Sequence, residues 1–170
     1  MRTLGKQAWA RYSKRKPKKS FVKAMPHLSL LNYHMGDGKK DYDTQFDICT
    51  NTDIQLRDNA LEASRQSSNK VLEKAIPNQY EFVVRVYPHN VIRENKMIAG
   101  AGADRLQKGM RKAYGRPTDR AARMRVGQAA FTIKTNAVNK PHVLEAFRRA
   151  KAKLSGHWSL VEKSIKPKAS

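Results

Sequence analysis

The chain has 170 residues, with 35 Lys and Arg against 14 Asp and Glu, so its formal net charge is +21. This length predicts a single domain, and a hydrophobic fraction of 39% is enough for a folded core. No apolar run approaches the roughly 20 residues that span a bilayer, the N-terminus lacks the apolar segment of a secretory signal, and Cys49 is the single cysteine. These features exclude a membrane protein, a disulfide-stabilised secreted protein and a cysteine-rich zinc site. They predict a soluble intracellular protein that binds a polyanion.

The positive charge is concentrated in separate blocks. Residues 1–23 carry nine Lys or Arg and no acid, whereas residues 24–92 carry seven bases and nine acids. Residues 93–125 carry ten bases and three acids, and residues 126–170 carry nine bases and two acids. Such dense like charges repel one another unless phosphates neutralise them, which indicates a nucleic-acid partner. For the N-terminal block alone, a solvated tail or a localisation signal is the alternative.

The predicted domain organisation is a basic arm over 1–26, one domain over 27–162 and a basic tail over 163–170. The arm has no regular periodicity and mixes Trp9, Tyr12 and Phe21 with cations. Aromatic rings stack on bases while ammonium groups contact phosphates, so this composition suits RNA. The predicted RNA-binding cations of the arm are Lys14, Arg15, Lys16, Lys18 and Lys19.

The first half of the domain predicts strands followed by a helix. The apolar stretch 27–33 predicts a strand, and the alternation over 45–56 predicts one strand or two strands joined near Asn51. Asn59 and Glu62 have the spacing of a capping box, and the helix that they begin ends at Pro77. Its apolar-to-small stripe consists of Leu61, Ser64, Ser68, Val71 and Ala75.

The second half predicts three strands, a helix and a last strand. Alternation over 80–86 predicts a strand, and alternation over 122–126 and 131–135, around a turn at 127–128, predicts a hairpin. A second helix begins near Asn139 and ends before Gly156, with the apolar face Val143, Phe147, Ala150 and Leu154. Residues 158–161 predict an edge strand. Together these elements predict an α+β fold: a two-layer sandwich of a largely antiparallel sheet of five or six strands with two helices on one face.

Residues 93–120 fit no regular element and form a glycine-rich basic loop, in which the flexible points are Gly100, Gly102 and Gly109. The sequence GAGADR begins like a dinucleotide fingerprint, but Arg105 replaces the third glycine and no buried strand precedes it. The histidines and acids show no metal-ligand or catalytic spacing. We therefore expect no cofactor, no metal and no enzymatic activity.

Four segments carry a family resemblance: LEASRQSSNK at 61–70, PHNVIRENKMIAGAGADRLQKGMRKAYGRP at 88–117, AARMRVGQAAFTIKT at 121–135 and VLEAFRRAKAKL at 143–154. They resemble, in order, the L-ten-e family of archaeal and eukaryotic large-ribosomal-subunit proteins, the counterpart of bacterial L-sixteen. The MGD at 35–37 and the lack of the long C-terminal extension of eukaryotic members favour the archaeal type. Residues 119–123 read DRAAR where the family usually reads GTAAR.

The resemblance implies a structural RNA-binding protein of the large subunit. Its partners would be large-subunit rRNA near the peptidyl transferase centre, tRNA at the A and P sites, and neighbouring ribosomal proteins, and it would join the subunit late in assembly. The mobile loop of the family would be residues 97–114. The motif cations expected to face RNA are Arg93, Lys96, Arg105, Lys108 and Arg111. To these the basic block adds Lys112, Arg116 and Arg123 as RNA-binding candidates.

Two other functional classes remain as alternatives. One is a free-standing RNA-binding factor, such as a tRNA-binding or assembly factor, which would share the fold but be absent from mature subunits. The other is an enzyme that acts on RNA, which would require a single essential acid or histidine.

Overall fold

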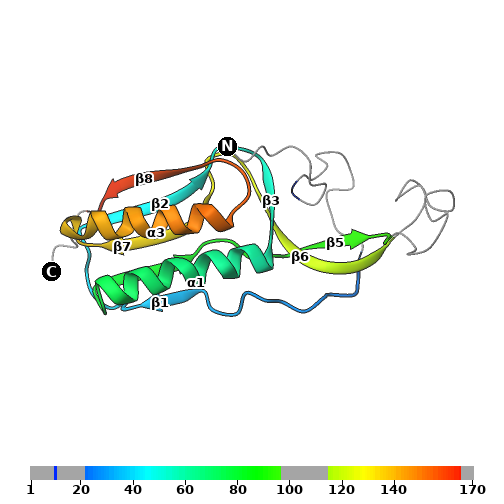
Figure 1. Cartoon of the computed structure of the whole chain (residues 1–170), viewed down its shortest axis with the longest axis horizontal. Helices are drawn as coiled ribbons and strands as arrows, with labels where there is room; N and C mark the ends of the chain where they lie inside the picture. The colour runs from blue at the N-terminus through cyan, green and yellow to red at the C-terminus, as the bar shows by residue number, and fades with distance from the viewer. Residues whose placement is uncertain (1–9, 11–21, 97–114, 166–170) are drawn as a thin grey trace.

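A computed structural model of the chain describes residue 10, residues 22–96 and residues 115–165, in which eight strands form two antiparallel sheets (Figure 1). The five-stranded sheet has the order β1-β4-β7-β2-β8, and the three-stranded sheet has the order β3-β6-β5. The strands are β1 (His34–Gly36), β2 (Thr44–Thr50), β3 (Ile54–Arg57), β4 (Tyr80–Val84), β5 (Asn90–Glu94), β6 (Arg116–Met124), β7 (Ala129–Thr135) and β8 (Trp158–Ser164). The predicted α+β class is confirmed, with a second sheet that the alternation patterns did not separate from the first.

Helices α1 (Asp58–Ala75) and α3 (Lys140–Lys153) lie side by side over one face of the five-stranded sheet, as predicted (Figure 1). They approach closely because small residues face each other. The hydroxyls of Ser64 and Ser68 donate hydrogen bonds to the carbonyl oxygens of Ala150 and Ala146, at 3.4 and 3.3 Å. The core between helices and sheet is fully apolar at its centre, where Phe82 and Phe131 contact each other with ring centroids 5.5 Å apart.

The predicted apolar stripes of the helices are only partly correct. In α1, Leu72 is buried, whereas Val71 is half-buried and Ala75 is exposed. In α3, Val143 and Ala150 are buried as predicted, but Phe147 is half-buried and Ala146 takes the central place. The reason is the close helix pairing, which leaves room for a methyl group at its centre and turns the larger ring toward the rim.

The predicted capping box at the start of α1 is wrong. The helix begins at Asp58, and Arg57 at the N-cap makes no side-chain capping bond. The Glu62 carboxylate instead accepts a hydrogen bond from Arg65 Nε at 2.8 Å. Asp58 Oδ1 accepts from the backbone N–H of Asn59, at 2.8 Å, so a carboxylate one residue earlier does part of the capping.

The strand predicted over residues 27–33 is also wrong, because strand pairing begins only at His34. Before that point the segment is held at Ser29, whose N–H donates to Asp58 Oδ2 at 2.8 Å, and at Tyr33, whose carbonyl accepts from the Val84 N–H of β4 at 2.8 Å. Its apolar residues divide accordingly: Leu30 is buried and Leu31 is exposed.

The predicted hairpin around Gly127 does not form. β6 pairs with β3 and β5 in the three-stranded sheet, whereas β7 pairs with β2 and β4 in the other sheet. The turn at 127–128 therefore carries the chain from one sheet to the other. It is held by backbone bonds to Thr50, which accepts from Gly127 N–H at 2.8 Å and donates to the Gln128 carbonyl at 3.2 Å. Position 127 has φ +80°, which favours glycine.

Other predictions are confirmed. The alternation over 45–56 is two strands, β2 and β3, which enter different sheets. The strand predicted at 80–86 is β4, which ends two residues earlier, and the second helix begins at Lys140 beside Pro141. The edge strand predicted at 158–161 is β8, which pairs with β2 and extends to Ser164. Among the described residues, no helix is long and apolar enough to cross a membrane.

Candidate nucleic-acid interface

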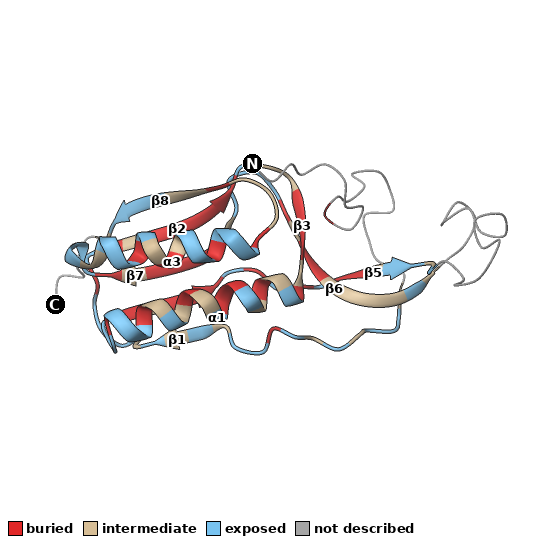
Figure 2. Cartoon of the chain, viewed as in Figure 1, coloured by how far each residue is buried: buried red, intermediate tan, exposed pale blue. Residues whose placement is uncertain are grey.

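The region 93–120, predicted as irregular, contains the end of one strand and the start of another. β5 and β6 pair as an antiparallel hairpin that projects beyond the ends of the two helices (Figure 1). A bulge between Ile92 and Arg93 shifts the register there. Figure 2 shows that the exposed end of β5 lies at the far end of this projection. Segment 97–114, which joins the strands, lies outside the described residues.

Three of the predicted RNA-binding cations meet at this end of the hairpin. Arg93 lies opposite Pro117, Arg116 lies opposite Glu94, and Lys96 follows two residues after β5. All three cations are exposed. They belong to two sequence segments that are brought together by strand pairing, so the structure converts separate basic positions into one cationic tip.

The fourth described cation, Arg123, is not at the tip. It lies at the other end of β6, half-buried, opposite Gln55 of β3. Gln55 also accepts a hydrogen bond from the Asn90 side chain at 2.7 Å. Arg123 is therefore placed within a polar layer of the three-stranded sheet and apart from the other three cations. The remaining predicted positions lie outside the described residues: Lys14, Arg15, Lys16, Lys18, Lys19, Gly100, Gly102, Arg105, Lys108, Gly109, Arg111 and Lys112.

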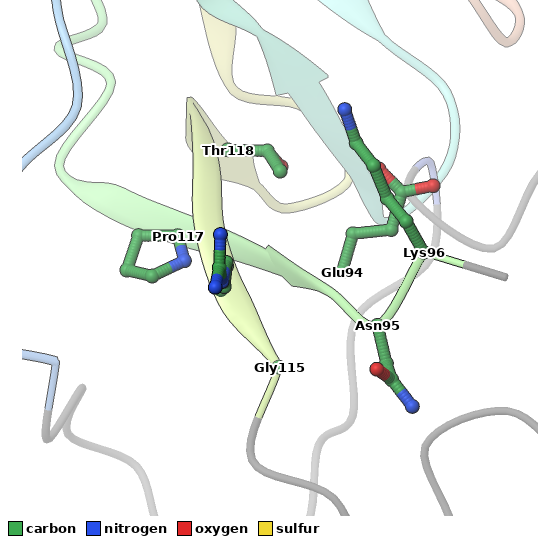
Figure 3. A pocket seen from close by; sticks show the side chains of 7 residues that line it. Glu94, Asn95, Lys96, Gly115, Pro117 and Thr118 are labelled. Carbon is green, nitrogen blue, oxygen red and sulfur yellow. The ribbon is translucent and has the colours of Figure 1, made fainter. Parts of the chain in front are cut away.

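A cavity of about 620 Å³ opens at the tip between the ends of the two strands. In Figure 3 the Glu94 and Lys96 side chains lie on one side of the end of β5, and the Asn95 side chain points away from them. The cavity is lined by Glu94, Asn95, Lys96, Gly115, Arg116, Pro117 and Thr118. Two cations, an amide and a hydroxyl against one carboxylate suit the phosphate and sugar groups of a polynucleotide.

Two arginines near this surface were missed by the sequence reasoning. Arg57, at the end of β3, forms an ion pair with Asp119 at 2.7 Å between Nη2 and Oδ2. Arg120 of β6 donates a hydrogen bond from Nη1 to the Tyr87 hydroxyl at 3.3 Å. The outer half of β6 carries no simple period-two signal, because the bulge opposite Ile92 and Arg93 interrupts its alternation. Asp119 and Arg120, which depart from the usual family sequence, thus lie inside a strand.

Several acids of the near-neutral block form ion pairs within the fold, among them Asp37, Asp47, Glu62 and Glu81. Asp47, almost fully buried in β2, accepts hydrogen bonds from Lys163 and Thr132 at 2.8 and 2.7 Å. Burial alone would raise the pKa of Asp47, but these hydrogen bonds, with one from Gln45, hold it below its ordinary value. Among the described residues no group of three His, Cys, Asp or Glu side chains is placed to hold a metal ion.

Comparisons with known proteins place the chain among ribosomal proteins. The profile of the family described as ribosomal protein L16p/L10e matches residues 9–161. Large ribosomal subunit protein uL16 of Staphylothermus marinus is 40% identical over 151 residues, which cover 88% of this chain and 87% of that protein. The uL16 protein of Hyperthermus butylicus is 44% identical over 138 residues, 81% of this chain and 77% of that protein. That of Methanococcus aeolicus is 39% identical over 154 residues, 90% of this chain and 85% of that protein.

Proposed function

This chain belongs to the ribosomal protein L16p/L10e family, and from that premise we propose that it binds large-subunit rRNA beside the peptidyl transferase centre, in reach of tRNA at the A and P sites. The family membership makes it a structural constituent of the large ribosomal subunit and not an enzyme. Its partners there are rRNA and neighbouring ribosomal proteins. In the proposed function it acts in the cytoplasm by positioning RNA, without chemistry of its own.

The observation that carries the proposal is the cationic tip of the β5–β6 hairpin. Arg93, Lys96 and Arg116 are all exposed at one end of a projection, away from the core that stabilises the fold. Cations at such a site contribute little to folding, whereas phosphate contacts made by Lys and Arg supply most of the affinity of a protein for RNA. The tip also flanks segment 97–114, the loop for which the family resemblance implies tRNA proximity.

The remaining predicted positions extend the proposed interface. In the loop, Arg105, Lys108 and Arg111 would contact RNA, and glycines 100, 102 and 109 would give the backbone its freedom. The basic segments 1–26 and 163–170 would add phosphate contacts at the ends of the domain 27–162. Arg123 and Lys112 complete the set of proposed RNA-facing cations.

The test places a hydroxyl-radical probe at the tip. Cys49 is buried and burial raises the pKa of its thiol, so a reagent reacts with an introduced exposed cysteine in preference. We would attach the probe to the Lys96→Cys variant, with Lys74→Cys on the exposed side of α1 as the control, and assemble each protein into large subunits isolated on a sucrose gradient.

Cleavage of rRNA at the peptidyl transferase centre, and of bound tRNA, from position 96 but not from position 74 is the expected result. Cleavage confined to distant rRNA would refute the proposed location while leaving the protein in the subunit. Recovery of the protein only at the top of the gradient would instead favour a free-standing RNA-binding factor.

A further inference from the structure

An exposed aromatic pair lies beside the base of the β5–β6 hairpin. Tyr33, just before β1, and Tyr87, in the segment after β4, stack with ring centroids 6.0 Å apart and an angle of 25° between the rings. Tyr87 keeps 51% of its surface exposed, although tyrosine rings in such pairs usually bury most of their area. Tyr33 therefore supports a ring that presents a large aromatic surface to the outside.

Two hydrogen-bonding groups beside this ring have no partner among the residues that the structure describes. Arg120 donates from Nη1 to Tyr87, but within this part of the chain its Nε, like the Tyr33 hydroxyl, is buried without a hydrogen bond. The nearby Asp58 carboxylate accepts from the backbone N–H groups of Ser29 and Asn59. Burial raises the pKa of Tyr33, so its hydroxyl stays protonated and remains a donor. Buried donors without acceptors are uncommon and costly, which indicates that acceptors arrive with a ligand.

Arg120 belongs to the same hairpin as the cationic tip but not to the same face of it. Arg120 pairs with Val91 and Arg116 pairs with Glu94, and the bulge between Ile92 and Arg93 lies between these two pairs. Paired residues share a face of the sheet, so the bulge places the two arginines on opposite faces of the hairpin. Their separation of four residues along β6 corresponds to about 13 Å.

We propose that Tyr87 and Arg120 bind one unpaired nucleobase of an RNA strand that also contacts the β5–β6 hairpin. The base stacks on the exposed face of the Tyr87 ring, whose other face is held by Tyr33. An acceptor atom on the edge of the base receives a hydrogen bond from the Arg120 guanidinium beside the ring. A paired base is excluded because its faces and edges are already occupied in the duplex. This inference rests on the RNA-binding function proposed above.

The experiment measures the affinity of the full-length chain for a short oligouridylate and for a blunt RNA duplex with the same number of phosphates. Tyr87→Ala should weaken oligouridylate binding about 5- to 100-fold, the range typical of a lost base–aromatic stack, and leave duplex binding unchanged. The slope of affinity against salt should not change, because the phenol neutralises no phosphate. Tyr87→Phe keeps the ring and should bind almost as the parent does.

Val138→Ala is the matched control, because Val138 is 87% exposed and truncating it removes exposed apolar surface elsewhere. Equal losses for oligouridylate and duplex in Tyr87→Ala would mean that the ring only supports the hairpin, and would overturn the proposal. Unchanged binding of both RNAs would also overturn it and would point to a protein partner at this face. In either case, the proposed RNA-binding function would stay intact if replacing Arg93, Lys96 and Arg116 at the tip with glutamine weakened oligouridylate binding.

Discussion

Neutralising the hairpin tip should change the salt dependence of RNA binding without unfolding the protein. The variant replaces Arg93, Lys96 and Arg116 with glutamine. All three side chains are exposed and lie outside the core, so each substitution should alter the free energy of unfolding by no more than about 0.5 kcal/mol. The perturbation is therefore aimed at the interface alone.

The magnitude follows from the number of cations at the tip. Each phosphate contact that is lost reduces the slope of log K against log salt by about 0.7 for single-stranded RNA and about 0.9 for a duplex. Three contacts thus predict a slope that is less steep by roughly 2 to 3. The largest loss of affinity should occur at low salt, where counterion release contributes most.

The assay is equilibrium binding of the full-length chain to a large-subunit rRNA fragment at a series of salt concentrations, with thermal unfolding as the test of folding. A control variant carries the same loss of charge at Lys39, Lys70 and Lys74, which are exposed on other parts of the domain. An unchanged slope in the tip variant, or an equal change in the control, would show that affinity depends on net charge and that the tip makes no specific phosphate contact.

Three further predictions concern the fold. Phe131→Ala should destabilise the domain by about 3–5 kcal/mol, because this ring is fully buried. Phe147→Ala should cost clearly less, because that ring is half-buried. Urea unfolding would measure both losses, and equal losses would contradict the burial pattern. Gly36→Ala and Gly127→Ala both place alanine at positive φ, at a cost of about 1–2 kcal/mol. Only Gly36→Ala also drives its Cβ into the Tyr80 carbonyl, so this variant should have the lower melting temperature. Equal melting temperatures for the two variants would refute the clash. The fold holds the pKa of Asp47 below its ordinary value. The ionised carboxylate therefore stabilises the folded state at pH values above the ordinary pKa of the carboxyl, and this stabilisation is lost as the pH falls through the folded-state pKa. Asp47→Asn should therefore lower stability at neutral pH and flatten the loss of stability in acid, which unfolding at a series of pH values would test.

Local sequence patterns correctly predicted those elements in which tertiary packing buries the same face that the pattern marks as apolar. The alternation of β4 and the helical spacing of α3 each reflect one buried face, which is a property of the residues themselves. The capping box failed because Glu62 had a stronger partner in Arg65 three residues later. The candidate site was predicted in part: Arg93, Lys96 and Arg116 are found together. Arg57, Arg120 and Tyr87 were not anticipated, since their partners are far away in the sequence.

By itself the sequence determined the α+β class, the separation of basic and near-neutral blocks, and the resemblance on which the family assignment first rested. These depend on residue type and short spacing, which the chain carries whatever its long-range pairing. Only the tertiary structure decided that the strands on either side of Gly127 enter different sheets, and that β5 and β6 instead form the projecting hairpin. An alternating strand has two edges that can pair with many others, and the choice among them is made by backbone hydrogen bonds and core packing between residues far apart in the chain.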